Sequence, residues 1–453
     1  MSHTIAAIST AAGKGAVGIV RLSGADTLPL VNRLFTAKSG ATAETWRVGQ
    51  LVLGTLHSPE GTTLDHALCV VRRGPFSYTG EDMAEFHCHG SPTLLLLALE
   101  TLVSCGARLA QAGEFTKRAF LNRRLDLAEA EAVGDLIDAE SEAAVTNAAA
   151  QLGGALSRRI GAIYDPLLTV AAHFHAVLDY PDEDIDAFTA EGLQSSLDEA
   201  VGQCAALLKS YETGRFFSSG IPCAIVGRPN SGKSSLLNAL LGYERAIVTH
   251  IAGTTRDTVE ERISLGGVSL RLIDTAGLRD SSDLVEQLGV ARSRKAMESA
   301  ALILWVVDGT EPLTAEDEAV AAAMPEGVPV ITLVNKADIG ARKPATAEFA
   351  QAVMISAKEQ SGMDELEQRI CAIFPPTESS ALGSVLTNAR QFDAASRGME
   401  YLSQAADSLR LGVPPDAVIA DLELALEALG ELNGTSMRED MTARIFEKFC
   451  VGK

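Results

Sequence analysis

The pattern of apolar and polar positions changes twice along the chain. From residue 1 to about 118, short runs of apolar and β-branched residues alternate with turns rich in Gly, Pro and Ser. The runs Ile5–Ile8, Gly18–Leu22 and Leu68–Val71 predict strands, and Thr93–Ser104 predicts a helix. This first segment is therefore expected to fold as a compact α/β domain.

The pattern becomes helical near Leu125. Ala, Leu and Glu recur at helical spacing to about Val177 and again over Leu193–Tyr211, and a helical pattern returns from about Leu386. An acidic break, Asp179–Asp184, separates the first two stretches. It lacks the spacing and the glycine of a calcium-binding loop, which favours a solvated turn between helices.

A third pattern lies over residues 216–378, between the helical stretches. Continuous apolar runs such as Cys223–Val226 and Val328–Val334 alternate with helical segments, which predicts a doubly wound α/β sheet. The flanking helical parts, residues 119–215 and 379–453, are each small for an independent core. We therefore expect them to pack together as one helical domain into which the α/β domain is inserted.

Composition limits the classes of protein that fit. The 453 residues, 47% of them hydrophobic, suffice for several domains with sizeable cores. No apolar run reaches the roughly 18 residues needed to span a bilayer, and the N-terminus lacks the basic and apolar regions of an export signal. Seven scattered cysteines without a C-x-x-C pair fit reduced thiols. Together these features predict a soluble cytoplasmic protein with no membrane partner.

The net charge of −21 argues against a protein that coats nucleic acid by bulk electrostatics. Any contact with RNA is expected to be local, or shared with another protein. The densest basic stretch is Lys117–Arg124. Two interpretations remain open for it, a local binding patch and a solvated helix start or loop.

A phosphate-binding motif opens the inserted domain. Residues Gly227–Ser234 read G-R-P-N-S-G-K-S and fill every fixed position of the pattern G-x-x-x-x-G-K-[ST], directly after an apolar run. In such a P-loop the glycines let backbone N–H groups point at phosphate oxygens. Lys233 would reach the β- and γ-phosphates, and the Ser234 hydroxyl would ligate Mg²⁺. The segment predicts binding of a nucleoside triphosphate.

Two further motifs follow predicted buried strands. Asp274–Gly277 reads D-T-A-G and Asn335–Asp338 reads N-K-A-D, so both would converge with the P-loop at the carboxyl edge of the sheet. The Asp338 carboxylate can only accept hydrogen bonds, and guanine offers it N1–H and N2–H₂ as paired donors. The nucleotide is therefore predicted to be GTP. Ser356–Lys358 is either a loop that contacts guanine O6 or an ordinary turn.

The end of the sequence and a loop within the inserted domain identify a family. The chain ends in Phe449–Lys453, with the pattern Cys-x-Gly-Lys, and Gly253–Asp257 reads G-T-T-R-D. Together they resemble the tRNA uridine modification GTPases of the MnmE or TrmE family, in the TrmE–Era–EngA–YihA–septin-like superfamily. The resemblance covers the whole length and includes Gly18–Gly24, Tyr78–Asp82, His89–Gly90, Gly113–Asn122 and Leu125–Ala132.

This resemblance implies a multidomain protein with an N-terminal folate-binding and dimerisation α/β domain (residues 1–118), a helical domain and an inserted Ras-like P-loop GTPase domain. It implies a homodimer that joins a flavin-dependent partner, MnmG or GidA, in a heterotetramer or larger assembly. The partner would carry FAD and use NADH. Together they would add an aminomethyl or carboxymethylaminomethyl group to C5 of the wobble uridine of certain tRNAs.

The resemblance also implies a folate site that supplies the one-carbon unit, as 5-formyltetrahydrofolate or a related folate. By motif match its residues are Arg21, Glu85, Arg124 and Lys453. Glu85 can pair with pterin N–H donors, and the three cations can meet carboxylates or carbonyls. Some members of the family have Lys in place of Arg124, which keeps the charge and changes the geometry.

Hydrolysis of GTP needs a catalyst other than the usual glutamine, because the residue after D-T-A-G is Leu278. The resemblance supplies two replacements: a K⁺ ion, which would offset developing charge, and Glu286, which would position the attacking water. The implied K⁺ ligands are the Asn230 side chain and the backbone carbonyls of Thr249, Ile251 and Thr254. Thr255 would complete Mg²⁺ ligation beside Ser234.

The expected nucleotide site can now be given in full. The predicted GTP-binding residues are Asn230, Ser231, Gly232, Lys233, Ser234, Ser235, Thr249, His250, Ile251, Ala252, Gly253, Thr254, Thr255, Asp274, Thr275, Ala276, Gly277, Asn335, Lys336, Ala337, Asp338, Ser356, Ala357 and Lys358.

The expected catalytic residues are Lys233, Glu286 and Cys450. For Cys450 two interpretations stay open, a nucleophile that attacks a pyrimidine or a one-carbon adduct, and a small buried hydrophobic residue. A second function class also stays open, a GTPase switch in ribosome assembly that modifies nothing. The folate-type N-terminal region and the Cys-x-Gly-Lys end argue against that alternative, and Asp338 argues against an ATPase.

Overall fold

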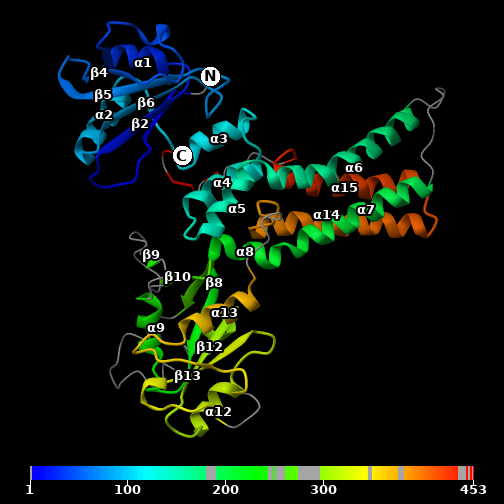
Figure 1. Ribbon diagram of the computed structural model, residues 1–453. Coiled ribbons are helices and arrows are strands. Elements are labelled where there is room, and N and C mark those ends of the chain that lie inside the picture. The colour runs from blue at the N-terminus through cyan, green and yellow to red at the C-terminus, as the bar shows by residue number, and fades with distance from the viewer. Residues whose placement is uncertain are drawn as a thin grey trace. The chain divides into compact units, whose positions relative to one another are not determined.

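The computed structural model divides the chain into two compact units, residues 1–134 with 427–453, and residues 135–426 (Figure 1). The division falls within helices α4 (Leu127–Ile137) and α15 (Pro415–Asn433). The structure describes residues 3–179, 190–242, 248–249, 261–273, 296–344, 349–375, 382–436, 445–446, 449–450 and 452.

The first unit is built on a seven-stranded sheet in the order β3-β4-β5-β6-β2-β1-β7. Neighbouring strands are antiparallel except for the parallel pair β1 and β7. The strands are β1 (Ile5–Ile8), β2 (Val17–Ser23), β3 (Phe35–Ala37), β4 (Val52–His57), β5 (Thr63–Arg72), β6 (Met83–His89) and β7 (Arg108–Leu109).

The two faces of this sheet carry different residues because side chains alternate along each strand. Val20 and Leu22 of β2 and Phe86 of β6 are buried against α1 (Thr27–Leu34) and α2 (Pro92–Ser104). The residues between them therefore point to the other face, where a second cluster includes Phe115 of α3 (Glu114–Leu121). This second face carries the polar residues described below.

The second unit contains another seven-stranded sheet, in the order β14-β13-β12-β8-β11-β10-β9. Strands β14 to β11 in this order run parallel, and β10 and β9 are antiparallel to their neighbours. The strands are β8 (Ile221–Val226), β9 (Val248–Thr249), β10 (Glu261–Leu265), β11 (Val268–Ile273), β12 (Leu302–Asp308), β13 (Val330–Asn335) and β14 (Val353–Met354). Its helices include α9 (Lys233–Leu241), α12 (Ala315–Ala322) and α13 (Met363–Ile373).

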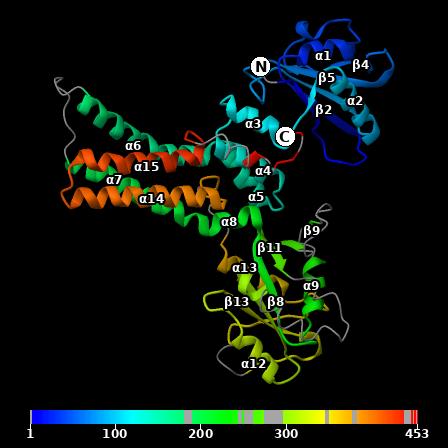
Figure 2. The ribbon, with the colours of Figure 1, turned by 180° about the vertical axis from the view of Figure 1, so that it is seen from behind.

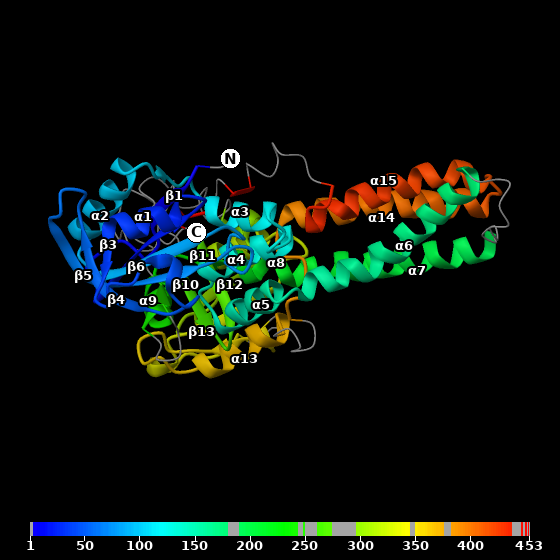
Figure 3. The same cartoon turned by 90° about the horizontal axis from the view of Figure 1, so that it is seen from above.

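Within the second unit, helices from both sides of the inserted sheet pack together. Figures 2 and 3 show α6, α7 and α14 side by side, with the unit's part of α15 beside them. Two hydrogen bonds join the segment before α14 to the earlier helices: Gln151 Nε2 donates to the Val385 carbonyl at 2.7 Å in a buried bond, and Arg159 Nη1 donates to the Ser384 carbonyl at 2.7 Å in a partly buried one. The helices are α5 (Glu142–Leu152), α6 (Ala155–Asp179), α7 (Ala190–Lys209), α8 (Tyr211–Ser219) and α14 (Ala389–Arg410).

The predicted strands and helices named above are confirmed, with small shifts at their ends. The predicted fold class, an α/β domain, a helical domain and an inserted P-loop domain, is confirmed as well. The acidic break begins at the end of α6, and its other residues lie outside the described part of the chain. No described helix combines the length and apolar character needed to cross a membrane.

Gln151→Ala should destabilise the helical part of the second unit. Gln151 is 1% exposed, and its loss leaves the Val385 carbonyl buried without this donor, at a cost of about 1–3 kcal/mol in the free energy of unfolding. Urea unfolding of the full chain, followed by far-UV circular dichroism, measures the change. The control is Gln203→Ala, whose amide bonds to Glu199 on the exposed side of α7. Equal midpoints for both variants would show that the Gln151 contact contributes nothing.

Candidate functional site

The P-loop joins the buried strand β8 to α9, and its backbone needs glycine at two positions. Gly227 and Gly232 have φ values of 153° and 100°, and a side chain on Gly232 would collide with Asn335. Asn230, at the exposed tip, is also left-handed with φ 61°, which Asn tolerates better than most residues. The loop thus directs its N–H groups, and the positive end of α9, toward one point.

Lys233 lies across this loop. Its Nζ donates to the carbonyls of Gly227 and Arg228, both at 2.8 Å. Burial lowers the pKa of Lys233. Ser234 and Ser235 follow on the first turn of α9 and are exposed. The predicted phosphate-binding side chains therefore lie together at the N-terminus of one helix.

Asn335 connects the P-loop to the two loops that are expected to bind guanine. It ends β13 and is 3% exposed. Its Nδ2 donates to the Ser231 carbonyl at 3.0 Å, and its Oδ1 accepts from the Ala357 backbone N–H at 3.1 Å. One buried amide side chain thus holds three predicted site segments together.

Asp338 is the residue expected to distinguish guanine from adenine. It lies in the short helix η2 (Ala337–Ile339) and is exposed. Ser356 Oγ donates to Asp338 Oδ1 at 2.8 Å, while the Ala337 N–H donates to the Ile355 carbonyl at 3.1 Å. The segment Ser356–Lys358 is therefore tied to the N-K-A-D loop by side-chain and backbone bonds, a closer association than an ordinary turn requires.

Sequence reasoning missed one strand that helps to form this site. The apolar run Leu302–Val307 is fully within β12, and it ends in Asp308, which is 5% exposed. Asp308 lies beside Arg228 of the P-loop and Lys336 of the N-K-A-D loop. The signal was present, because a continuous apolar run that ends in Asp-Gly is typical of a buried parallel strand.

Several predicted site residues lie outside the described part of the chain. They are His250, Ile251, Ala252, Gly253, Thr254, Thr255, Asp274, Thr275, Ala276, Gly277, Glu286 and Lys453, together with Leu278. Of Thr249 only the backbone is described, in β9 where it pairs with Arg262.

A second polar site lies on the face of the first sheet opposite α1 and α2. Arg21 of β2 and Glu85 of β6 are cross-strand partners, and Arg21 Nε donates to Glu85 Oε1 at 2.8 Å. Their side chains are 19% and 21% exposed. The Arg21 guanidinium lies 5.7 Å from the ring centre of Phe115 and 6.0 Å from that of Tyr78, near the limit for a cation–π contact.

The C-terminal segment lies against this pair. The Gly452 carbonyl accepts from Ser9 Oγ at 3.1 Å and from Arg21 Nη1 at 3.4 Å, and the Cys450 carbonyl accepts from the Gly113 N–H at 3.3 Å. Gly452 has φ 99°. A Cβ there would collide with the Ile8 backbone carbonyl oxygen, and the positive φ also disfavours any residue with a side chain. Glycine in the Cys-x-Gly-Lys motif thus allows close packing.

The Cys450 side chain is exposed, so the interpretation as a small buried hydrophobic residue is wrong. Cys69, Cys88 and Cys223 are buried. Burial raises the pKa of Cys88 to about 12 and also raises the pKa of Cys69 and Cys223. Exposure leaves Cys450 accessible to a reactant, as a nucleophile must be.

Arg124 reaches the same site through the neighbouring loop. Its Nε donates to the Ser77 carbonyl at 3.1 Å, next to Tyr78, whose hydroxyl lies 2.9 Å from Thr116 Oγ1. Burial raises the pKa of Tyr78. Arg124 and Arg21 thus approach neighbouring residues of one loop, at Ser77 and Tyr78.

The basic stretch Lys117–Arg124 is not a continuous exposed patch. Arg118 is 7% exposed and donates to Glu81 Oε2 at 2.7 Å and to Glu114 Oε1 at 3.0 Å. With Arg118 and Arg124 engaged by the protein itself, the interpretation as a local patch of consecutive charges loses its support. These residues instead hold the loop of residues 77–82.

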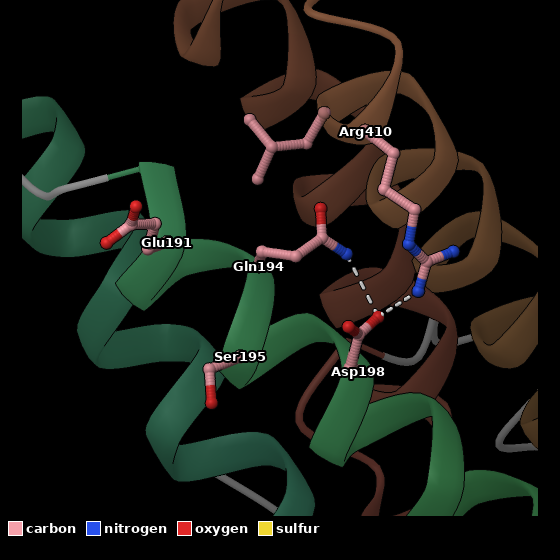
Figure 4. Close-up of a pocket in the computed structure, with 6 residues that line it drawn as sticks. Glu191, Gln194, Ser195, Asp198 and Arg410 are labelled. Carbon is pink, nitrogen blue, oxygen red and sulfur yellow. Dashed lines mark hydrogen bonds and ion pairs between the residues drawn. The ribbon is translucent and has the colours of Figure 1, made fainter.

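A pocket of about 580 Å³ lies elsewhere in the second unit, between α7 and α14 (Figure 4). Asp198 accepts there from Gln194 Nε2 at 2.9 Å and from Arg410 Nη2. Asp198 thus joins Gln194 to Arg410, and none of the lining residues belongs to a predicted motif. The lining residues are Glu191, Gln194, Ser195, Asp198, Leu409 and Arg410.

Comparison with known proteins gives one consistent result. Residues 127–450 match the family model of the MnmE helical domain, and residues 4–124 match that of the GTP-binding protein TrmE N-terminus. The chain is 41% identical to the tRNA modification GTPase MnmE of Heliobacterium modesticaldum over 466 aligned positions, with 100% of each chain covered. It is 41% identical to that of Symbiobacterium thermophilum over 456 positions, covering 100% of this chain and 99% of the relative.

Among solved structures, Era in complex with MgGDPNP and part of 16S ribosomal RNA is 30% identical to the aligned part, which covers 40% of this chain and 65% of that chain. The TM-score of 0.27 is too low for this likeness to carry an argument.

Asp338→Asn should change the preferred base. The substitution removes a carboxylate acceptor that would pair with guanine N1–H and N2–H₂, and GDP affinity should fall by about tenfold to hundredfold. Xanthosine diphosphate, which has a carbonyl where guanine has the amino group, should bind the variant better than the unchanged chain. Competition titrations measure both affinities. Glu365→Gln, at an exposed position of α13, is the matched control, and an unaltered GDP preference in Asp338→Asn would refute the assignment.

Proposed function

This chain belongs to the MnmE family of tRNA modification GTPases, and from this premise we propose that K⁺ activates its GTP hydrolysis and that a folate supplies the one-carbon unit. The modification would be an aminomethyl or carboxymethylaminomethyl group on C5 of the wobble uridine. The observation that best supports the proposal is the contact of the C-terminal segment with the Arg21–Glu85 pair.

The P-loop geometry supports the proposed binding of the nucleotide. The N–H groups of the loop and the N-terminus of α9 would bind the phosphates, with Lys233 adding positive charge. The exposed Ser234 hydroxyl suits Mg²⁺, which prefers oxygen ligands and would complete its shell with phosphate oxygens and water. Asp338, oriented by Ser356, would fix the guanine.

A K⁺ ion fits the chemistry of the P-loop tip. Asn230 presents an amide oxygen from an exposed, left-handed position. The cationic side chain nearest before it in the sequence is that of Arg228, and this side chain pairs with the carboxylates of Glu311 and Asp317. A cation near the phosphates stabilises charge that develops during hydrolysis. The other proposed ligands, at Thr249, Ile251 and Thr254, and the water-positioning Glu286 come from the family resemblance.

The second site fits a folate. Glu85 offers carboxylate oxygens to the pterin N–H donors, the Tyr78 ring offers apolar surface, and Arg124, with Lys453, suits the carboxylate end. A bound folate would supply the one-carbon unit. Cys450, exposed next to Gly452, is the proposed nucleophile.

The proposed assembly is a cytoplasmic homodimer formed through the N-terminal domains, bound to a flavin-dependent partner of the MnmG type that carries FAD and uses NADH. The net charge of −21 favours a tRNA contact that is local or shared with this partner. We also propose the domain limits 1–118, 119–215, 216–378 and 379–453.

GTP turnover should depend on K⁺. Replacing K⁺ by Na⁺ at equal ionic strength should lower kcat at least about tenfold, the size of effect expected from removing one stabilising charge in the transition state. Glu286→Ala should lower kcat at least as strongly and leave GDP affinity unchanged. Phosphate release at saturating GTP, with GDP titration as the control, measures both. Equal turnover in the two salts would contradict the proposal.

Arg21→Ala should weaken folate binding without changing nucleotide binding. Loss of one charged hydrogen-bond donor should lower the affinity for 5-formyltetrahydrofolate about tenfold or more. Arg21→Lys should recover only part of this affinity, because an ammonium group lacks the planar fork. Calorimetry on the full chain measures both ligands. Arg33→Ala, an exposed arginine of α1, is the control, and folate affinity equal to the unchanged chain in Arg21→Ala would place the folate elsewhere.

A further inference from the structure

Arg228, the residue after the first glycine of the P-loop, lies among carboxylates. Its Nε is 3.4 Å from Asp317 Oδ2, and its Nη2 is 3.8 Å from Asp308 Oδ2 and 2.5 Å from Glu311 Oε2. The side chains of Arg228, Asp308 and Asp317 are 14%, 5% and 1% exposed, whereas that of Glu311 is 58% exposed. Two of the three contacts are therefore with buried charges, where ion pairs are screened least.

Both buried carboxylates are fixed by bonds of their own. Asp317 Oδ2 accepts from the Thr314 N–H at 3.0 Å and from Thr314 Oγ1 at 2.8 Å, which caps α12. Asp308 Oδ1 accepts from the Thr310 N–H at 3.0 Å and from Thr310 Oγ1 at 2.6 Å at the end of β12. The Arg228 side chain is thus attached to the ends of two rigid elements.

Asp308 extends this connection to the loop that is expected to bind the base. The same Oδ2 that faces Arg228 pairs with Lys336 Nζ. Lys336 directly follows Asn335 in the N-K-A-D loop and has a left-handed backbone, with φ 71°. Burial pushes the pKa of Asp308 up, but hydrogen bonds from Lys336 and Thr310 outweigh it and lower the pKa below its usual value. Asp308 is therefore a charged bridge between two cations.

The backbone of Arg228 also takes part in the site. Its carbonyl accepts a hydrogen bond from Lys233 Nζ at 2.8 Å. A side chain fixed to Asp317 and Asp308 restricts the backbone that bears this carbonyl, and so restricts the position of Lys233. The Arg228 guanidinium itself is directed at the carboxylates of β12, α12 and the residues between them.

We propose that Arg228 is a positioning residue for guanine nucleotides. Through its ion pairs with Asp317 and Asp308 it fixes the distance between the P-loop and the N-K-A-D loop. The first loop can then bind the phosphates while the second binds the base of the same nucleotide. This tether acts beside the one made by Asn335. It concerns nucleotide affinity alone, and it stands whether or not K⁺, a folate or a partner protein takes part.

The test uses the full chain with Arg228→Gln and Asp317→Asn. The Asn at position 317 keeps an oxygen that can cap α12 and loses the charge that holds Arg228. Each variant should raise the Kd for GDP and the KM for GTP about tenfold, because the ion pair between Arg228 and Asp317 is lost, and change kcat at saturating GTP less than about twofold. A residue with a merely structural role would not give this division between KM and kcat.

The double variant distinguishes a shared tether from two separate effects. If the two residues act through each other, Arg228→Gln with Asp317→Asn should raise the Kd for GDP about tenfold, as each single change does, rather than about a hundredfold. Glu316→Gln is the matched control, because it changes a charge on the exposed side of the same helical turn and should leave the Kd for GDP unchanged.

Three results would overturn the proposal: an unchanged Kd for GDP in both single variants, a fall in kcat with KM unchanged, or multiplied effects in the double variant. Should Arg228→Gln fail to fold, Asp317→Asn alone decides by its Kd for GDP and its kcat.

Discussion

The nucleotide site depends on one buried amide. Asn335 is almost fully enclosed, and each end of its side chain bonds a backbone group of a different loop, the P-loop at Ser231 and the Ser356–Lys358 loop at Ala357. A buried amide that lost either bond would leave a polar group unpaired, at a cost of about 1–3 kcal/mol. The loops are therefore held in one arrangement by the same residue that ends β13. The three loops lie at the carboxyl edge of the parallel sheet, and the hydrogen bonds of Asn335 hold them together as one site.

In the first unit, the C-terminal segment likewise joins distant parts of the chain through hydrogen bonds. A glycine with a left-handed backbone lets the segment approach Ser9 closely, and its carbonyl meets the Arg21 side chain. Residues more than four hundred positions apart in the sequence thus form one polar site. The glycine of the Cys-x-Gly-Lys pattern therefore has a structural role, since it lets the end of the chain pack against Ser9 and Arg21.

The sequence predicted the features that depend on neighbouring residues, such as strands and the P-loop, and it did not predict side-chain pairs between distant residues. The glycines of the P-loop are visible in the sequence because their backbone angles exclude other residues, and the apolar runs of β8, β11 and β13 follow from their burial. The pairing of Arg228 with Asp317 joins residues from separate elements, and no local pattern encodes it. Arg118 reads as one charge in a basic stretch, yet it is buried on Glu81. Residues such as Glu286 remain predictions, because they lie outside the described part of the chain.

The central claim is that GTP hydrolysis at this P-loop serves modification of tRNA. Mass spectrometry of the wobble uridines tests it most directly, in cells that lack this chain and in the same cells supplied with either the unchanged chain or Lys233→Ala. The account predicts that the C5-modified uridine disappears without the chain, returns with the unchanged chain and stays absent with Lys233→Ala. Wobble uridines that are the same in all these cells would contradict it and favour a GTPase switch that modifies nothing.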